Sequence, residues 1–226
     1  MNLKEEIRHF VLKLPDGVDM IGFAAVSRFK EIPLVRHPSL LLPEAKTVIV
    51  IASQLFRSVT ENLSANNKQG EVSYQNIFKA HKEVVDNNLN QMGYKIAHFL
   101  TRNGYPSVHL DKNITDARNL SAIFSFKYAA YLAGLGVIGN NKLLLTKEFG
   151  PRIRLCSVIT QAPLEADQTL LFEPCKSCNN ICVKACPCGA LKELSDGKIS
   201  YNKFLCSTFY SNNGGCSLCL GKCPIK

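Results

Sequence analysis

The chain lacks the segments that would place it in or across a membrane. Its longest apolar stretch lies around TVIVIA, far shorter than the roughly 20 residues that span a bilayer. The first residues, MNLKEEIRHFVLKLPDG, are charged throughout, and they contain neither the apolar core of a signal peptide nor a twin-arginine pair. We therefore expect a cytoplasmic protein that is not associated with a membrane.

Cysteine, in contrast, is abundant, with 10 residues among 226. Most of them form two C-terminal groups that each end in C-x3-C-P. The first group is Cys175, Cys178, Cys182 and Cys186, and the second is Cys206, Cys216, Cys219 and Cys223. A C-x2-C-x2-C-x3-C-P run is typical of bacterial ferredoxins with two 4Fe–4S clusters, in which the cysteine before the proline ligates the other cluster.

This crossing rule predicts which cysteines share a cluster. The first cluster takes Cys175, Cys178, Cys182 and Cys223, and the second takes Cys186, Cys206, Cys216 and Cys219. The sequence departs from the pattern twice: three residues separate Cys178 from Cys182, and Cys206 lies ten residues before Cys216. Neither departure changes the number of ligands.

Two other uses of these cysteines are weighed against clusters. Paired C-x2-C motifs also build four-cysteine zinc sites, although the two C-x3-C-P endings favour clusters. Disulfides are disfavoured, because a reducing compartment keeps thiols free. The remaining cysteines, Cys156 and Cys188, are predicted to be small buried hydrophobic residues.

The formal net charge of +9 suggests an acidic partner such as RNA. Eight ligating thiolates and two oxidised cluster cores would lower this charge to about +5. The sequence has no run of five like charges, so a mildly basic solvated surface and an RNA-binding face both remain open.

Hydrophobic periodicity predicts an α/β domain with a mixed sheet over residues 1–170, followed by a ferredoxin-like two-cluster module over residues 171–226. Helices are expected over residues 2–14, 73–103 and 120–134, and strands over residues 19–27, 47–56, 105–110 and 150–160. Ser73 is the expected N-cap of the long helix, and Gly104 is the glycine expected to end it.

A glycine-rich turn, AGLGVIGNN, contains Gly134, Gly136 and Gly139. Dinucleotide-binding folds carry such a G-x-G-x-x-G after a strand, with an acidic residue about twenty positions later. Here the motif follows a predicted helix, and the later position falls in SVIT, which disfavours a dinucleotide site. The glycines allow either a loop whose backbone approaches a ligand or a tight turn between a helix and a strand.

The glycine turn and the later run CKSCNNICVKACPCGAL together resemble epoxyqueuosine reductases, which are cobalamin-dependent iron–sulfur enzymes of tRNA queuosine synthesis. The run FGPRIRLCSVITQAPL is similar to the equivalent stretch of reductive dehalogenases. The resemblance covers roughly residues 74–226. It implies that the turn holds a base-off cobalamin through Gly134, Gly136, Val137, Ile138, Gly139 and Asn141, with Asn140 in place of the family lysine.

The resemblance breaks down upstream of the turn, where these reductases carry a proton-donating aspartate in a D-x-x-P-v-x-E-R pattern. The aspartate position is Leu120, the glutamate position is Phe126 and the arginine position is Lys127. Asp111 or Asp116 would substitute only if the local alignment shifts.

A second proton donor is implied by the reductive dehalogenases, which use a tyrosine with a nearby cation. Lys127 and Tyr128, with Tyr131 one turn later, precede the glycines, so Lys127 and Tyr128 are the candidate catalytic residues. The alternative is a core-facing tyrosine beside a surface lysine. The sequence has no D-x-H-x-x-G corrinoid motif, and none of its five histidines has a specific case as an axial ligand.

The leading hypothesis is an iron–sulfur oxidoreductase that passes low-potential electrons through two 4Fe–4S clusters to a cobalamin, or to another cofactor or substrate, at the Gly134–Gly139 turn. One alternative is an electron-transfer or corrinoid-reactivating partner protein without a substrate of its own. Another is an enzyme that acts on tRNA in the queuosine pathway. The expected partners are an electron donor such as ferredoxin or flavodoxin, and either a corrinoid enzyme or tRNA.

Overall fold

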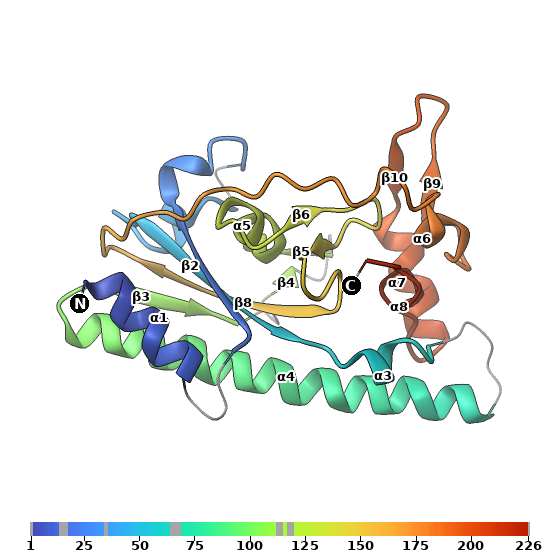
Figure 1. Ribbon diagram of the computed structural model, residues 1–226, viewed down its shortest axis with the longest axis horizontal. Coiled ribbons are helices and arrows are strands. Elements are labelled where there is room, and N and C mark those ends of the chain that lie inside the picture. Colours follow the sequence, from blue (N-terminus) through green and yellow to red (C-terminus); the bar gives the residue numbers. More distant parts are fainter. Residues whose placement is uncertain are drawn as a thin grey trace. The chain divides into compact units, whose positions relative to one another are not determined.

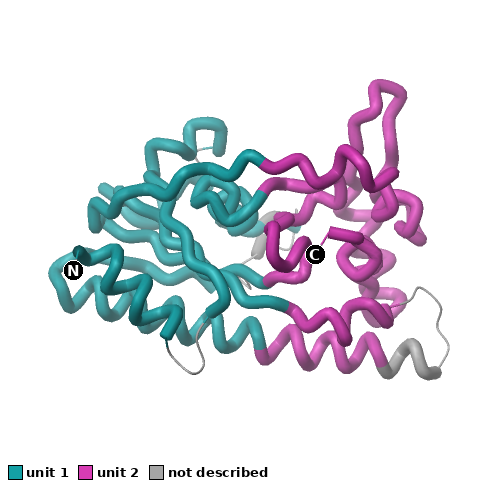
Figure 2. The backbone as a smooth tube through the Cα atoms, viewed as in Figure 1, with its two compact units in different colours: residues 1–54, 85–136, 154–171 teal, residues 55–84, 137–153, 172–226 magenta. Residues whose placement is uncertain are grey.

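The structure is a computed structural model that describes residues 2–13, 18–33, 36–63, 69–111, 115–116 and 120–225. The chain divides into two compact units (Figure 2). Unit 1 comprises Met1–Gln54, Val85–Gly136 and Arg154–Leu171, and unit 2 comprises Leu55–Val84, Val137–Ile153 and Phe172–Lys226. Across the described ranges, no helix has both the length and the apolar character needed to span a bilayer.

Unit 1 is built on a sheet of four strands in the order β1-β2-β8-β3 (Figure 1). The strands are β1 (Met20–Ala25), β2 (Thr47–Gln54), β3 (Ser107–Leu110) and β8 (Ile153–Thr160). β1 pairs with β2 in antiparallel register, with Phe23 opposite Ile49. β3 and β8 are also antiparallel, with Ser107 opposite Thr160.

Helices cover both faces of this sheet. On one face, α1 (Leu3–Lys13) and the second part of α4 (Gln69–Arg102) pack onto the strands. The shared core on that face includes Ile7, Phe23, Ile49, Leu89, Met92, Ile96 and Val158. Because side chains alternate along a strand, Gly22 faces the other side, where a Cβ atom would lie 2.5 Å from the carbonyl oxygen of Ala133. The helix α5 (Phe126–Leu132) therefore approaches the second face closely.

The segment after β8 is tied to β1 and to the end of α5. Asp167 accepts hydrogen bonds from the guanidinium of Arg8 at 3.1 Å and from the backbone N–H of Phe23 at 3.0 Å. Arg28, in the 3-10 turn η1 (Val26–Arg28), donates to the carbonyl oxygens of Leu132 at 2.9 Å and Asp167 at 2.6 Å. These bonds fix the chain directly before the glycine turn.

Unit 2 is made of short elements that surround the cysteines. Besides the first part of α4, they are α3 (Arg57–Thr60), β6 (Val137–Ile138), β7 (Leu144–Leu145), α6 (Ile181–Lys184), β9 (Leu191–Glu193), β10 (Ile199–Tyr201), α7 (Lys203–Asn212) and α8 (Leu218–Gly221). α6 contacts α8 and β9, and α3 contacts α8. The predicted module over residues 171–226 lies almost entirely in this unit, together with two segments from earlier in the chain.

The α/β fold and the four main strands are confirmed. The N-cap prediction is wrong, because α4 begins at Gln69 rather than after Ser73. Gly104 does follow α4 in a left-handed conformation, with φ of 84°. The helix predicted over residues 120–134 is also wrong at its start: Ser121–Ala122 forms β5, paired with β4 (Thr115–Asp116). Leu120 has φ of 49°, and a left-handed residue interrupts a right-handed helix.

The prediction for Cys156 as a small buried residue is confirmed. Its side chain is only 4% exposed, within the core that α4 shares with the sheet. Burial raises the pKa of this thiol to about 12, so it is a neutral packing group. Cys188 is half-buried rather than buried, and its sulfur lies 3.9 Å from that of Cys186.

Gly93→Ala should destabilise the fold, because a Cβ atom there would lie 2.6 Å from the sulfur of Cys156. Overpacking of this kind costs about 1–3 kcal/mol in the free energy of unfolding. In a Cys156→Ala background the sulfur is absent, so the same substitution should cost less. Unfolding followed by circular dichroism in the four proteins of this cycle measures the difference, and an equal cost in both backgrounds would contradict the contact.

Candidate metal centre

The eight cysteines of the two motifs all lie in unit 2. Cys175 and Cys178 precede α6, Cys182 lies within it, and Cys186 follows it. Cys206 lies within α7, Cys216 precedes α8, Cys219 lies within α8, and Cys223 follows it. All ten cysteines of the chain belong to the described residues, and all are free thiols.

The electrostatic neighbours of these thiols fall into two sets. Burial raises the pKa of Cys182 to about 11, followed by the effects of Cys178, Cys223 and Cys175. The pKa of Cys223 is likewise raised by burial, and its thiol neighbours are Cys175 and Cys178. Cys223 therefore lies among the cysteines of the first motif, although it belongs to the second motif in the sequence.

The second set shows the reciprocal exchange. The pKa of Cys216 is raised by burial, then by Cys206 and Cys186. Burial raises the pKa of Cys219 to about 12, and its thiol neighbours are Cys216, Cys206, Cys182 and Cys186. Cys186 of the first motif is thus a neighbour of the second motif's thiols, and Cys219 also has Cys182 of the first motif as a neighbour. The division into two ligand sets stays a prediction.

The described thiols are neighbours, but they are not close enough together to form a complete set of metal ligands. Within the described part of the chain, no three His, Cys, Asp or Glu side chains already converge as a metal site. The donor set nevertheless fits a thiolate-bound metal, because buried thiols with raised pKa values are neutral in the metal-free protein and lose their protons when they bind metal. The same set fits iron–sulfur clusters or zinc.

Three buried polar side chains hold the second cysteine segment by its backbone. Gln75 donates to the carbonyl oxygen of Cys216 at 3.0 Å, and Asn141 donates to that of Cys219 at 3.3 Å. Arg152 donates to the carbonyl oxygen of Cys223 at 3.1 Å and also to that of Ile225. Gln75, Asn141 and Arg152 are 7%, 5% and 5% exposed. Gln75 comes from one segment of unit 2, and Asn141 and Arg152 come from another. Neither is the segment that carries the cysteines, so the fold and not the motif places these three cysteines.

Sequence reasoning missed Gln75 and Arg152 as supports of the candidate centre. Gln75 lies in a polar stretch of α4, and Arg152 directly precedes an apolar strand. Gln75 lies in no motif, and Arg152 lies in the run that resembles reductive dehalogenases, where nothing marks it as a support for the cysteines. The only signal was a strongly polar residue at a position that the fold buries, and burial is known only once the tertiary structure is known.

The first glycine of the turn belongs to unit 1 and is required by packing. Gly134 has φ of 74°, and a Cβ atom there would lie 2.1 Å from the carbonyl oxygen of Gln168. Both observations account for glycine at this position without a ligand. Gly136, two residues later, is buried.

The second half of the turn belongs to unit 2. A Cβ atom at Gly139 would lie 2.5 Å from Cδ1 of Leu145, so this glycine also meets an internal packing demand. Val137 and Ile138 form β6, and the side chain of Ile138 is 39% exposed. Ile138 is therefore the member of the predicted cobalamin-binding set that presents apolar surface.

Asn140 and Asn141 connect the turn to both sets of cysteines. The backbone N–H of Asn140 donates to the sulfur of Cys175 at 3.3 Å, and its side chain donates to Asn180 at 2.7 Å. The side chain of Asn141 accepts the backbone N–H of Leu143 at 3.1 Å while it donates to the carbonyl oxygen of Cys219. Both groups of the Asn141 amide are therefore engaged inside the protein.

The candidate catalytic residues lie on α5 in unit 1. Lys127 is exposed and Tyr128 is half-buried, and adjacent side chains on a helix point about 100° apart. The pKa of Tyr128 is raised by burial first, then by the carboxylate of Glu31 and by Tyr131. The ring of Phe29 lies 6.3 Å from that of Tyr128. The structure thus brings Tyr128 to Glu31 and to an aromatic cluster.

Three residues were considered for the position of the family aspartate, and the structure gives each a different environment. Leu120 is 37% exposed. Asp111 accepts a hydrogen bond from the side chain of Asn90 at 3.0 Å. The side chain of Asp116 lies outside the described residues.

Sequence comparison finds relatives over nearly the whole chain. No family model matches it. The epoxyqueuosine reductase of Listeria monocytogenes is 27% identical, over 99% of this chain and 65% of its own length. A tetrachloroethene reductive dehalogenase of Desulfitobacterium hafniense is 31% identical, over 60% of this chain and 27% of its own. The resemblance to epoxyqueuosine reductases is confirmed.

Solved structures share the fold of this chain. An epoxyqueuosine reductase superposes with a TM-score of 0.64 and 21% identity, over 99% of this chain and 65% of that one. A catabolic reductive dehalogenase gives a TM-score of 0.66 and 17% identity, over 92% and 30%. This chain spans less than two thirds of the length of each of these relatives.

Arg152→Gln should loosen the second cysteine segment, because two backbone carbonyl oxygens lose a buried charged donor. Leaving such groups unpaired costs about 1–3 kcal/mol of local stability. Metal bound by the protein should then be lost faster to a chelator, which absorbance and metal analysis follow over time. Arg57→Gln is the matched control, since Arg57 lies in the same unit with a side chain that is 59% exposed. Equal rates of loss in the two variants would contradict a role for Arg152.

Proposed function

We propose that this chain is an iron–sulfur oxidoreductase that passes low-potential electrons through two 4Fe–4S clusters to a cobalamin, or to another cofactor or substrate, at the Gly134–Gly139 turn. The observation that carries the proposal is the exchange between the two cysteine motifs. Cys223 has Cys175 and Cys178 as neighbours, and Cys186 is a neighbour of Cys216 and Cys219. Zinc sites do not require such an exchange, whereas paired clusters in ferredoxins are built by it.

The protein's own residues would hold and tune these clusters. One set of ligands is Cys175, Cys178, Cys182 and Cys223, and the other is Cys186, Cys206, Cys216 and Cys219. When bound, such clusters supply one-electron transfer at potentials between about −700 and +450 mV, set by burial and by hydrogen bonds to sulfur. The N–H of Asn140, which already points at the sulfur of Cys175, would stabilise negative charge on that cluster and so raise its potential.

Cobalamin as the electron acceptor rests on the relatives. A solved reductive dehalogenase structure is described in terms of a B12-dependent mechanism. In this chain the exposed Ile138 would contact the ligand, while Gly134 and Gly139 keep the turn closely packed. We propose Tyr128 as the proton donor, with Lys127 as the nearby cation. A tyrosine phenol is protonated at neutral pH even at its ordinary pKa, and burial and Glu31 raise the pKa of Tyr128 further, whereas Leu120 has no proton to give.

A different function is favoured by one departure from the family. Leu120 stands at the position of the proton-donating aspartate, and a protein that only transfers electrons needs no proton donor. The alternative is therefore an electron-transfer or corrinoid-reactivating partner that receives electrons from a ferredoxin or flavodoxin in the cytoplasm.

A tRNA substrate is the third candidate. One epoxyqueuosine reductase has been solved with an epoxyqueuosine-modified tRNA stem loop. That complex makes tRNA a reasonable partner to test for this chain, which covers 65% of that protein. Salt-dependent binding would support it, since contacts to phosphates release counterions.

Metal analysis of protein purified anaerobically tests the clusters. The unaltered chain should contain about eight iron atoms and eight sulfides. Cys186→Ser should lower the iron content to about half, because it removes a ligand of one cluster only. Cys188→Ser is the matched control, two residues away with its sulfur 3.9 Å from that of Cys186, and it should keep the full content. Zinc in place of iron, or equal losses in both variants, would refute the ligand assignment.

A cobalamin titration of the iron-loaded protein separates the reductase from the electron carrier. If the protein is a cobalamin-dependent reductase, it should show a base-off corrin spectrum at saturation. An unchanged spectrum would support the electron-transfer protein instead. Tyr128→Phe should keep that spectrum but lower turnover of an epoxyqueuosine substrate, because general acid catalysis contributes about 10²- to 10⁴-fold. Tyr131→Phe is the control one turn along α5. Turnover that survives Tyr128→Phe would remove Tyr128 as the donor.

A further inference from the structure

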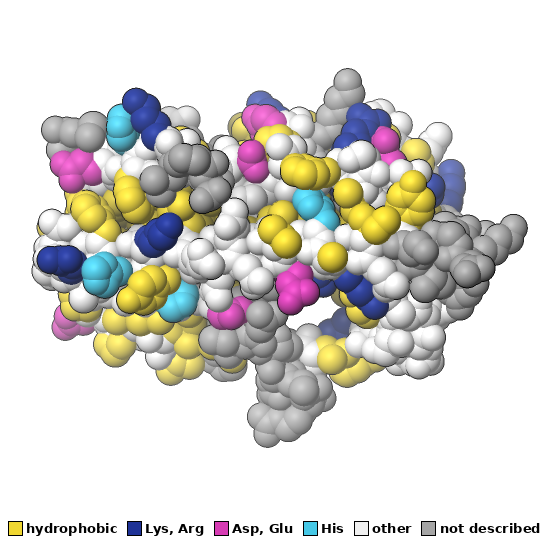
Figure 3. All heavy atoms as spheres, turned by 90° about the horizontal axis from the view of Figure 1, so that it is seen from below, with side chains coloured by type: hydrophobic (Ala, Val, Ile, Leu, Met, Phe, Trp, Pro, Cys, Tyr) yellow, Lys and Arg dark blue, Asp and Glu magenta, His cyan; other side chains and the backbone are white. Residues whose placement is uncertain are grey.

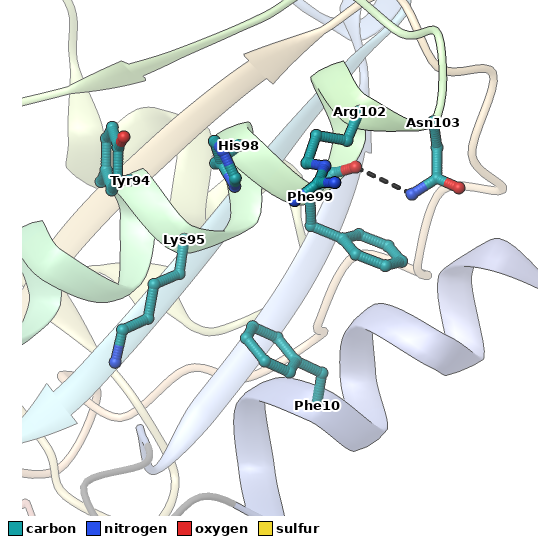
Figure 4. Close-up of a pocket in the computed structure, with 7 residues that line it drawn as sticks. All are labelled: Phe10, Tyr94, Lys95, His98, Phe99, Arg102 and Asn103. Carbon is teal, nitrogen blue, oxygen red and sulfur yellow. Dashed lines mark hydrogen bonds between the residues drawn. The ribbon is translucent and has the colours of Figure 1, made fainter.

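A groove in unit 1 runs between α1 and the last turns of α4. It has a volume of about 510 Å³ and is lined chiefly by Phe10, Tyr94, Lys95, His98, Phe99 and Arg102 (Figure 4). A second hollow of about 340 Å³ adjoins it, because Tyr94 and Lys95 line both, and it reaches His109 on β3. Together the two hollows are in the size range of small-ligand sites.

The helical spacing of α4 creates this lining. Residue 91, the pair 94 and 95, and residues 98 and 102 follow one another at intervals of three or four positions, so they form one stripe along the helix. The buried residues Met92, Ile96 and Leu100 form a different stripe that faces the sheet. Phe99 packs against that core and stacks on Phe10. The other α4 side chains of the first groove are exposed, so packing inside unit 1 does not explain their chemistry.

Aromatic rings make up much of the groove. The ring of Tyr94, a residue 56% exposed, stacks on His98 with centroids 5.9 Å apart. His109 meets the same tyrosine edge-on at 5.8 Å. Phe10 and Phe99 face each other between the two helices with centroids 6.3 Å apart (Figure 4). Such rings offer flat faces on which a planar ligand can stack.

The described side chains that line the groove are cationic or neutral. Lys95 and Arg102 are exposed cations and His98 adds an imidazole ring, while no carboxylate is among the described residues that line either hollow. The carboxylate of Asp111 is engaged by Asn90 at 3.0 Å. Figure 3 shows Lys, Arg and His side chains interleaved with hydrophobic ones over this part of α4. The complementary ligand is therefore an anion that also carries a flat ring.

We propose that this groove binds a nucleotide unit, with its base stacked on the aromatic rings and its phosphate held by Lys95 and Arg102. Stacking faces interleaved with cations are the chemistry by which proteins bind single-stranded nucleic acid. Two sources carry this chemistry, a free nucleotide and a single strand of RNA. The site uses no cysteine and no residue of the glycine turn, so it does not depend on the proposed redox chemistry. With RNA as its source it deepens the tRNA candidate named above.

The test is binding by the full-length, metal-loaded protein. One probe is a fluorescein-labelled single-stranded RNA of about eight nucleotides, followed by anisotropy at several salt concentrations, and the other is adenosine monophosphate as a competitor. Lys95→Gln with Arg102→Gln should weaken RNA binding roughly ten-fold or more at low salt and lower the salt slope by about 0.7, since one neutralised phosphate is lost. Tyr94→Ala should weaken it about 5- to 100-fold, and Tyr94→Phe should restore it.

The matched control is Lys30→Gln with Lys147→Gln, which removes two exposed cations outside the groove. Displacement of the RNA by adenosine monophosphate would identify a free nucleotide as a sufficient ligand, and RNA binding without displacement would identify the strand. The proposal is overturned if the unaltered protein binds neither probe, or if the groove variant and the control bind alike. Iron content should be unchanged in all variants, so failure of the groove and failure of the clusters are distinguishable.

Discussion

The arrangement of unit 2 depends on buried hydrogen bonds to the backbone of its cysteine segments. Three cysteine carbonyl oxygens are held by Gln75, Asn141 and Arg152, none of which belongs to a cysteine motif. A buried donor without its acceptor costs more than the bond itself contributes, so these contacts are strongly specified. They fix the backbone positions from which the side chains of Cys216, Cys219 and Cys223 extend, and they do so without a metal.

The residues of the glycine turn have two structural roles: the glycines allow close packing, and the asparagines that follow bind the cysteine segments. Gly134 in unit 1 and Gly139 in unit 2 are required by close backbone and side-chain neighbours. Asn140 and Asn141 are directed at the cysteines through an N–H and an amide. The turn is therefore a structural neighbour of the candidate metal centre, and its relation to a corrin ligand rests on the resemblance to known reductases. The contacts of this chain therefore support metal binding by the thiols, whereas the choice of electron acceptor rests on the resemblance alone.

Helix α4 illustrates how one element serves several demands. Its first part contributes Gln75 to unit 2, and its second part contributes Leu89, Met92 and Ile96 to the core of unit 1. A third stripe carries Tyr94, His98 and Arg102. The period of 3.6 residues keeps these stripes on separate faces, so polar, apolar and aromatic requirements coexist along 34 residues.

The sequence by itself determined the thiol count and the strands β1, β2, β3 and β8, because cysteine content and runs of β-branched residues are local signals. The crossing of the two cysteine motifs stays a prediction. The start of α5 was misread, since the left-handed Leu120 has no sequence mark of its own. Only the tertiary structure decided that Gln75 and Arg152 support the cysteines, that Tyr128 lies beside Glu31, and that Asn141 faces inward. Each of these depends on which distant segments meet, and burial and hydrogen-bond partners are set by that meeting rather than by neighbours in the chain.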